Sequence, residues 1–217
     1  MSYFIKPNMI VIGVDEAGRG PLFGDVYTGS VILPDTDFDF SCLKDSKKFS
    51  SKKKIKEVYD YIKENAQYYD VDFANIEEID NYNILQATQK SMHRSIHKII
   101  TKYLNDYPDT NMMDFKIFVD GNYFNSFHYF HNDQIHIIQH ECLIKGDDKC
   151  KSISAASILA KVSRDEYIID FINKHPDYEE KYGLSKNKGY GTKVHIEGIK
   201  NHGYSPYHRK TFKLKSI

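Results

Sequence analysis

The segment MIVIGVDEAGRGPLFG, residues 9–24, decides how the rest of the sequence is read. Its apolar start, residues 9–14, predicts a short buried strand, and Asp15 and Glu16 follow directly. An arginine framed by glycines, Gly18-Arg19-Gly20, comes next. Carboxylates repel the phosphates that a glycine-rich cationic loop attracts, because like charges oppose one another. The two features are compatible only if a cation lies between the acids and the phosphates.

Hydrophobic patterning outside this segment predicts strands that alternate with helices. Residues 26–33 read as a second strand that forms a hairpin with the first. The Ser and Ala residues in the first half of segment 152–172 allow a helix there to approach a sheet closely. The other predicted elements are helices at 50–66 and 81–104, a strand at 115–122 that ends at Asp120, and a strand-like region at 134–144.

This alternation predicts an α/β fold with a mixed central sheet flanked by helices. The length of 217 residues favours a single sizeable domain. After His175-Pro176 the composition shifts to Lys, Gly, Tyr and His. We therefore expect residues 1–172 to form the core and residues 173–217 to form a C-terminal helical cap, within one compact unit.

Bulk composition limits the classes of protein that need considering. Thirty basic and thirty acidic residues cancel, yet nine Lys/Arg and only one acid, Glu197, lie from Lys181 onward. This distribution favours a locally electropositive C-terminal region, although a merely solvated surface explains the charge equally well. Three cysteines without a CxxC pair argue against zinc or disulfide scaffolds. We expect a soluble, intracellular (cytoplasmic) protein without a membrane segment.

Acidic residues recur where the predicted core elements end. Asp15 and Asp120 each close an apolar run, and Asp147-Asp148 lie between a strand-like region and the small-residue helix. Any one of them alone reads more readily as a helix cap or turn residue. Together they predict a carboxylate cluster, which suits two Mg²⁺ or Mn²⁺ ions that activate water against a phosphodiester.

Six motifs in this order resemble type 2 ribonuclease H, the ribonuclease HII family. They are GVDEAGRGPL (13–22), LKDSKK (43–48), VDGN (119–122), KGD (145–147) followed by ISAASILAKVSRD (153–165), NKGYGTKVH (187–195) and HRKTF (208–212). The resemblance implies a ribonuclease H-like core with a helical cap. It also implies metal-dependent cleavage of RNA in RNA·DNA hybrids, and incision 5′ to ribonucleotides embedded in duplex DNA, with 3′-hydroxyl and 5′-phosphate ends.

The resemblance also assigns roles to individual residues. The four acids of the family fall on Asp15, Glu16, Asp120 and Asp147, and the distance to ISAAS favours Asp147 over Asp148. The substrate-binding residues that it implies are Gly18, Arg19 and Gly20 and the partner residue Tyr190 at the ribose, with Lys47 and Lys161 at phosphates.

Several features leave the assignment open in detail. Tyr190 is also one of seventeen tyrosines, so its motif alone singles it out. Asp25 stands where the family often has proline, which adds negative charge that could alter metal preference. His208 and Arg209 match the family pattern, but they either contact nucleic acid or only anchor the cap. The last residues, 210–217, contain no convincing sliding-clamp motif, and we expect a monomer.

Three other identities compete with this one. A type 3 ribonuclease H carries Gly-Lys-Gly at the loop together with an extra N-terminal domain, which we do not expect here. Another nuclease on the same core has no use for a loop that senses a 2′-hydroxyl. A catalytically silent hybrid-binding module has no need to keep four acids that oppose phosphate binding.

Overall fold

The computed structural model describes residues 9–44 and 46–212, with the side chain of Lys47 outside the description. Its centre is a six-stranded mixed sheet in the order β3-β2-β1-β4-β6-β5. β1 pairs antiparallel with β2 and parallel with β4, and β4 pairs parallel with β6. The strands are β1 Ile10–Ala17, β2 Val26–Ile32, β3 Tyr68–Ala74, β4 Phe115–Asp120, β5 Phe127–His131 and β6 Gln134–Leu143.

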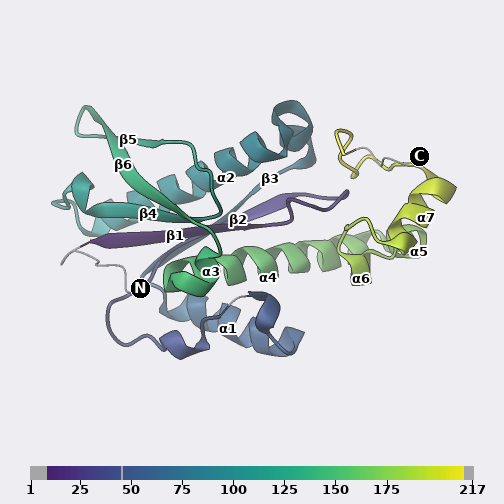
Figure 1. The fold of residues 1–217 in the computed structure, drawn as a ribbon, viewed down its shortest axis with the longest axis horizontal. Helices are drawn as coiled ribbons and strands as arrows, with labels where there is room; N and C mark the ends of the chain where they lie inside the picture. Colours follow the sequence, from purple (N-terminus) through teal and green to yellow (C-terminus); the bar gives the residue numbers. More distant parts are fainter. Residues whose placement is uncertain (1–8, 45, 213–217) are drawn as a thin grey trace.

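Helices cover both faces of the sheet, which makes three layers. Figure 1 shows α2 on one face and α1 with α4 on the other, while α5, α6 and α7 gather beyond the far end of α4. The mixed α/β fold predicted from the sequence is confirmed. The helices are α1 Lys52–Asn65, α2 Ile76–Asp106, α3 Gly146–Lys149, α4 Lys151–Lys174, α5 Pro176–Tyr182, α6 Leu184–Asn187 and α7 Lys193–His202.

Strand alternation assigns each residue of β1 to one of the two layers. Ile12 and Val14 are buried against the α2 layer, together with Ile117 and Val119 of β4. Gly13 lies on the opposite face, where a Cβ atom would stand 2.1 Å from the Ser152 carbonyl carbon of α4. Asp15, two residues further along the strand, belongs to the same face as Gly13.

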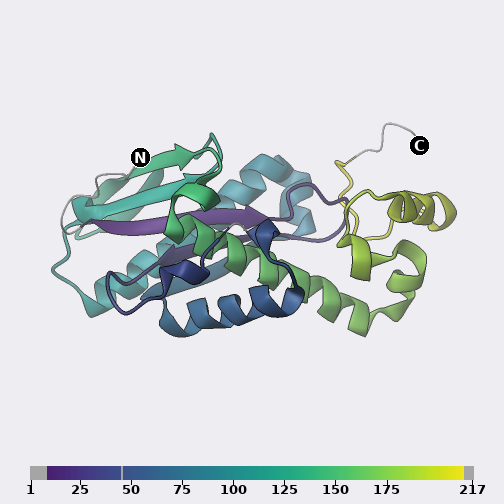
Figure 2. The same ribbon diagram turned by 60° about the horizontal axis from the view of Figure 1, so that its bottom comes forward.

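The second contact of this kind lies on β2. A Cβ atom on Gly29 would stand 2.4 Å from the Ala156 carbonyl oxygen of α4. Gly29 is the register partner of Asp15 across the β1–β2 hairpin. The predicted small-residue helix therefore lies directly on the strands because glycine faces serine and alanine, as Figure 2 shows for the path of α4 along the sheet.

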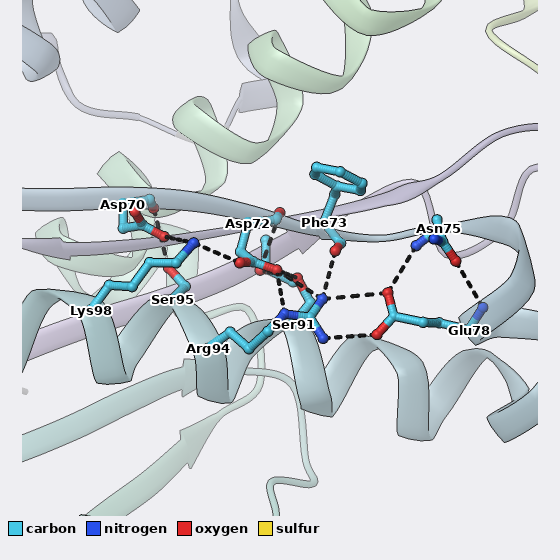
Figure 3. Close-up of polar contacts among 10 residues, drawn as sticks. Asp70, Asp72, Phe73, Asn75, Glu78, Ser91, Arg94, Ser95 and Lys98 are labelled. Carbon is cyan, nitrogen blue, oxygen red and sulfur yellow. Dashed lines mark hydrogen bonds and ion pairs between the residues drawn. The ribbon is translucent and has the colours of Figure 1, made fainter.

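A polar network ties the edge strand β3 to α2. The Asp72 carboxylate, almost buried, accepts hydrogen bonds from Ser91, Arg94 and Lys98 of α2. Lys98 also pairs with Asp70 (Figure 3). Arg94 also donates to Glu78, which forms a capping box with Asn75 at the start of α2. Edge-strand charges of this type hold β3 in place and discourage pairing with another chain.

The C-terminal helices pack against both α4 and the loop after β1. Leu22 and Phe23 of the loop share an apolar cluster with Ile168 and Phe171 of α4 and with Tyr182, Leu184 and Ile199 of α5–α7. Backbone hydrogen bonds join Leu22 to Gly189 and to Arg209. Residues from the first strand's loop and from the last quarter of the chain thus meet in one cluster (Figures 1 and 2).

Some predicted boundaries were wrong. β1 continues to Ala17, so Asp15 and Glu16 lie inside the strand and not beyond its end. The long helix starts at Ile76 rather than 81 and breaks at Asn83, whose φ is 66° and whose side chain caps the next turn. β3 and β5 were not predicted. No helix within residues 9–44 and 46–212 is long and apolar enough to cross a membrane.

Candidate active site

Asp15 lies at the centre of the site. Its side chain is almost buried beneath α4, and it accepts a hydrogen bond from the Ser157 hydroxyl and another from the Glu16 backbone N–H. Ser157 in turn shares a hydrogen bond with Ser46. Burial raises the pKa of Asp15 well above its usual range, and the charges of Glu16 and Asp120 raise it further.

Asp120 ends β4, the parallel neighbour of β1. Its Oδ1 accepts the Gly146 N–H at 2.6 Å. Gly146 follows β6 and opens α3, which carries Asp147 in its first turn. The sheet therefore brings Asp15 and Asp120 to one face, and the β6–α3 turn brings the backbone before Asp147 to the Asp120 carboxylate.

The two adjacent acids of α3 have different surroundings. Asp148 forms an ion pair with Lys48 at 2.5 Å. Oδ1 of Asp147 accepts the Asp148 N–H at 3.1 Å. Each of the two acids has contacts of its own, and the choice of Asp147 made from the sequence stays a prediction.

Glu16 and Arg19 connect the acids to the glycine loop. Nη1 of Arg19 lies 3.2 Å from Oε1 of Glu16, and the arginine side chain is 48% exposed. The pair is a surface contact of small energetic value, since solvent screens it. The opposition between acids and cationic loop noted in the sequence is therefore a direct contact here.

The acids suit a hard divalent cation. Within the described residues, no group of three or more His, Cys, Asp or Glu side chains is drawn together closely enough to hold a metal ion. Yet Asp15 is a buried carboxyl whose ionised form is opposed by burial and by two further acids. A bound divalent cation would remove that opposition, and an all-oxygen donor set favours Mg²⁺ or Mn²⁺ over zinc because these ions prefer hard ligands.

Arg209 holds the glycine loop by its backbone. The guanidinium is fully buried, and four of its N–H groups donate to loop carbonyls at 2.7–3.0 Å. Those carbonyls belong to Gly18, Arg19, Pro21 and Gly24. Burial lowers the pKa of Arg209 to about 9, and the charge of Arg164 adds to the effect. The Arg209 side chain thus hydrogen-bonds to the loop after β1 of the protein itself.

A second buried arginine completes this support. Arg164 of α4 donates to the carbonyls of Phe23, Asp25 and Lys188. Asp25, whose effect on metal preference the sequence left open, lies beside the two guanidinium groups, and it accepts the Ile76 N–H. Burial raises the pKa of Asp25 to about 6, while Arg209 and Arg164 oppose that rise.

Gly18 is required by its neighbour, and Gly20 lies close against another side chain. Gly18 has a φ of 94°, and a Cβ atom there would stand 2.0 Å from Nε of Arg164. A Cβ atom on Gly20 would stand 3.3 Å from Cε1 of Tyr190. Tyr190 is about half exposed. The structure therefore brings the loop and Tyr190 together, as expected from the motifs.

A directed chain of hydrogen bonds positions the Tyr190 backbone. The Ser205 N–H donates to Nδ1 of His208, which leaves the His208 proton on Nε2. That nitrogen donates to Nε2 of His195 at 3.0 Å, and Nδ1 of His195 donates to the Tyr190 carbonyl at 3.0 Å. Both rings are buried, and burial lowers the pKa of each. The hydrogen bonds of this chain join residues within the C-terminal region, and whether His208 also contacts nucleic acid stays open.

Of the two lysines predicted to bind phosphates, the structure describes the side chain of Lys161 alone. Lys161 lies on α4 and forms an ion pair with Asp165 at 2.5 Å. Lys47 lies in the 3-10 helix Ser46–Lys48, and its side chain is outside the described part. Residues 213–217, at the end of the segment inspected for a clamp motif, also lie outside it.

The sequence analysis missed the supporting roles of Ser157, Arg164 and His195. A signal for the first two was present, because Ser157, Lys161 and Arg164 recur at spacings of four and three along a helix and so share one face.

Comparison with known proteins gives a consistent result across the chain. A family model described as Ribonuclease HII matches residues 12–215. The Ribonuclease HII of Endomicrobium trichonymphae is 44% identical over 211 residues, which cover 97% of this chain and 89% of that protein.

Solved structures agree on the fold. The ribonuclease H2 of Pyrococcus horikoshii OT3 matches with a TM-score of 0.70 at 22% identity, covering 94% of each chain. The crystal structure of Bst-RNase HIII in complex with Mn²⁺ matches with a TM-score of 0.56 at 19% identity, covering 90% of this chain and 63% of that one. At these identities the two structures support the fold alone.

The buried histidine pair predicts a pH dependence of stability. Burial, and then His195, lowers the pKa of His208 to about 4 in the folded protein, against about 6.5 in an unfolded chain. When the pH is lowered from 7 to 5, the unfolded chain gains a proton at this residue and the folded protein does not. The free energy of unfolding therefore decreases as the pH is lowered. Urea denaturation should show the wild type losing about 2 kcal/mol more than His208→Asn over this interval.

Titrating groups that do not contact His208 are present in both proteins and cancel in this comparison. An equal loss in the wild type and in His208→Asn would mean that His208 accepts a proton within the fold, which would contradict the directed chain.

Proposed function

This chain belongs to the ribonuclease HII family of metal-dependent endoribonucleases, and we propose that Asp15, Glu16, Asp120 and Asp147 form its catalytic centre. The activity of the family is cleavage of RNA in RNA·DNA hybrids and incision at ribonucleotides embedded in duplex DNA. The observation that carries the assignment of the centre is Asp15, a buried carboxyl beside Glu16 and Asp120 whose pKa is raised by burial and by both neighbours.

The four carboxyl groups are the proposed ligands of two divalent ions, Mg²⁺ or Mn²⁺. When bound, the ions lower the pKa of water and stabilise the leaving 3′ oxygen, which gives 3′-hydroxyl and 5′-phosphate ends. Ser157 orients Asp15 by its hydrogen bond, and the Gly146 N–H orients Asp120. Both donors favour the ionised carboxylate, which is the form that binds a cation.

The glycine loop and Tyr190 are the proposed readers of the ribose. Arg209 binds four loop carbonyls, so the backbone of Gly18-Arg19-Gly20 keeps one conformation. A glycine without a side chain lets that backbone approach a 2′-hydroxyl, the group that distinguishes RNA from DNA. The Tyr190 ring is the proposed surface that packs on the adjacent sugar, and its half-exposed position against Gly20 supports this role.

The remaining parts of the proposal concern the wider substrate contact. Lys47 and Lys161 are proposed phosphate contacts, with Lys161 exchanging Asp165 for the phosphate. Residues 1–172 are proposed as the catalytic core and residues 173–217 as a substrate-binding cap, acting as a monomer.

A duplex with one labelled ribonucleotide tests the catalytic centre. We expect the wild type to incise 5′ to the ribonucleotide with Mg²⁺ or Mn²⁺ and to be inactive in EDTA. Asp147→Asn should lower kcat by at least about 100-fold because it removes an acid that binds the ions, a loss of about 3 kcal/mol in transition-state stabilisation. Asp148→Asn is the matched control, since Asp148 pairs with Lys48, and it should retain activity within a few-fold.

The reverse pattern, an inactive Asp148→Asn with an active Asp147→Asn, would move the fourth acid by one residue. A wild type that binds hybrid but never cuts it with either metal would refute the catalytic centre.

Tyr190→Ala should separate the two substrates. At a single embedded ribonucleotide only one 2′-hydroxyl is available, whereas a long hybrid offers many registers for productive binding. We therefore expect kcat/KM to fall by about ten-fold or more on the single ribonucleotide, a loss of about 1.4 kcal/mol or more, and clearly less on a long hybrid. Tyr107→Ala, another half-exposed tyrosine distant in sequence, is the control. Equal losses on both substrates would remove the sensing role of Tyr190.

A further inference from the structure

A groove of about 690 Å³ lies between α1 and α4. The four proposed catalytic acids are not among its lining residues. Its lining includes Lys52 at the start of α1, Lys161 and Asp165 on α4, and Lys188 from the segment before Tyr190. Ser46, which hydrogen-bonds Ser157, also lines it. The groove therefore begins beside the residues that support Asp15.

Lys188 is the unusual residue of this groove. Its side chain is only 8% exposed, and its ammonium has no hydrogen-bond partner among the described residues. The backbone around it is constrained, with a φ of 51° and a carbonyl that accepts a hydrogen bond from Arg164 at 3.0 Å. A buried ammonium without a partner is costly, so a ligand is expected to supply one.

Charges of both signs surround Lys188, and Asp165, Glu166 and Asp170 line the groove together with the lysines. Lys52, Lys161 and Arg164 act on it as like charges, and Asp165 is the one opposite charge among its main influences. The Asp165 carboxylate already pairs with Lys161 at 2.5 Å. Burial lowers the pKa of Lys188, and the negative charge of Asp165 partly offsets this effect. An anion in the groove would offset the like charges of Lys52, Lys161 and Arg164 further than Asp165 alone does.

The start of α1 adds to this preference for an anion. Ser51 caps the helix, and Ser51, Lys52 and Lys53 all line the groove. α1 is 14 residues long with no acid in its first turn. Its first backbone N–H groups and the positive end of its dipole favour a bound anion.

The position of the groove indicates which anion it takes. Lys188 lies two residues before Tyr190, and Lys161 lies one helical turn from Ser157, which contacts Asp15. A ligand held there is close both to the ribose-reading residues and to the catalytic acids. Among the groups of a nucleic acid, only the backbone phosphate carries the required negative charge.

We propose that this groove is a phosphate subsite in which Lys188 and Lys161, at the N-terminal end of α1, bind one backbone phosphate of the substrate. The subsite rests on the proposed function, because it names a further contact with the same nucleic acid. Among the residues that the structure describes, Lys188 has no partner in the free protein, and the bound phosphate supplies one.

Lys188→Met tests the subsite, because methionine keeps the length of the side chain and removes the charge. Affinity for a duplex with one ribonucleotide, measured in EDTA by fluorescence anisotropy, should fall about ten-fold or more. The slope of log Kd against log salt should decrease by about 0.9, the value for one lost phosphate contact. In Mg²⁺ the loss should appear in KM rather than in kcat.

The free Lys188→Met protein should melt about 2–4 °C higher than the wild type, since an unpaired buried charge is removed. A purely structural lysine would give the opposite change. Lys56→Met is the matched control from the same groove, because Lys56 already pairs with Asp60 at 3.0 Å and Glu166 at 2.8 Å. It should leave the affinity and the salt slope nearly unchanged.

Single methylphosphonate replacements identify the strand. If the subsite holds a phosphate of either strand, one neutral position will weaken the wild type and leave Lys188→Met unaffected, and the strand carrying that position is the one bound. If the wild type cuts but Lys188→Met shows the same Kd and salt slope, the subsite is refuted while the proposed function stands. A wild type that neither binds nor cuts the duplex refutes both.

Discussion

The close contact between α4 and the hairpin of β1 and β2 is the constraint on which the site depends. Gly13 and Gly29 leave no space for a side chain, since a Cβ atom on either would stand within 2.4 Å of the α4 backbone. This distance places Ser157 over Asp15 and aligns Lys161 and Arg164 along the same helix face. Larger residues at either glycine would separate helix and sheet, because close-packed layers do not yield to extra volume.

The site divides opposite charges between two structural devices. Asp15 and Asp120 lie on the sheet face under α4, where burial disfavours the ionised form of Asp15. Arg209 and Arg164 donate hydrogen bonds to backbone carbonyls of the loop after β1. Their positive charges also act on the neighbouring Asp25. We propose that a cation binds at these acids and that the loop backbone contacts the substrate, while the two buried arginines contact the protein itself.

The sequence predicted the parts of this arrangement that follow from local pattern. Apolar runs located β1, β2, β4 and β6, and the Ser and Ala residues of α4 predicted a close helix–sheet contact. Edge strands β3 and β5 were missed because their alternation includes charged residues and histidines, which a pattern of apolar residues does not detect. Buried Arg164 and Asp25 were not recognised, since tertiary contacts alone explain a charge in the interior.

The central claim is that burial and two neighbouring acids oppose the ionised form of Asp15, and that a bound divalent cation stabilises that form. The most direct test is a carboxyl ¹³C NMR titration of Asp15, assigned with Asp15→Asn, with and without Mg²⁺. The account predicts a pKa well above the usual range for aspartate in the free protein and a pKa below that range when Mg²⁺ is present. A carboxyl that titrates near the ordinary value of about 4 and ignores Mg²⁺ would contradict it.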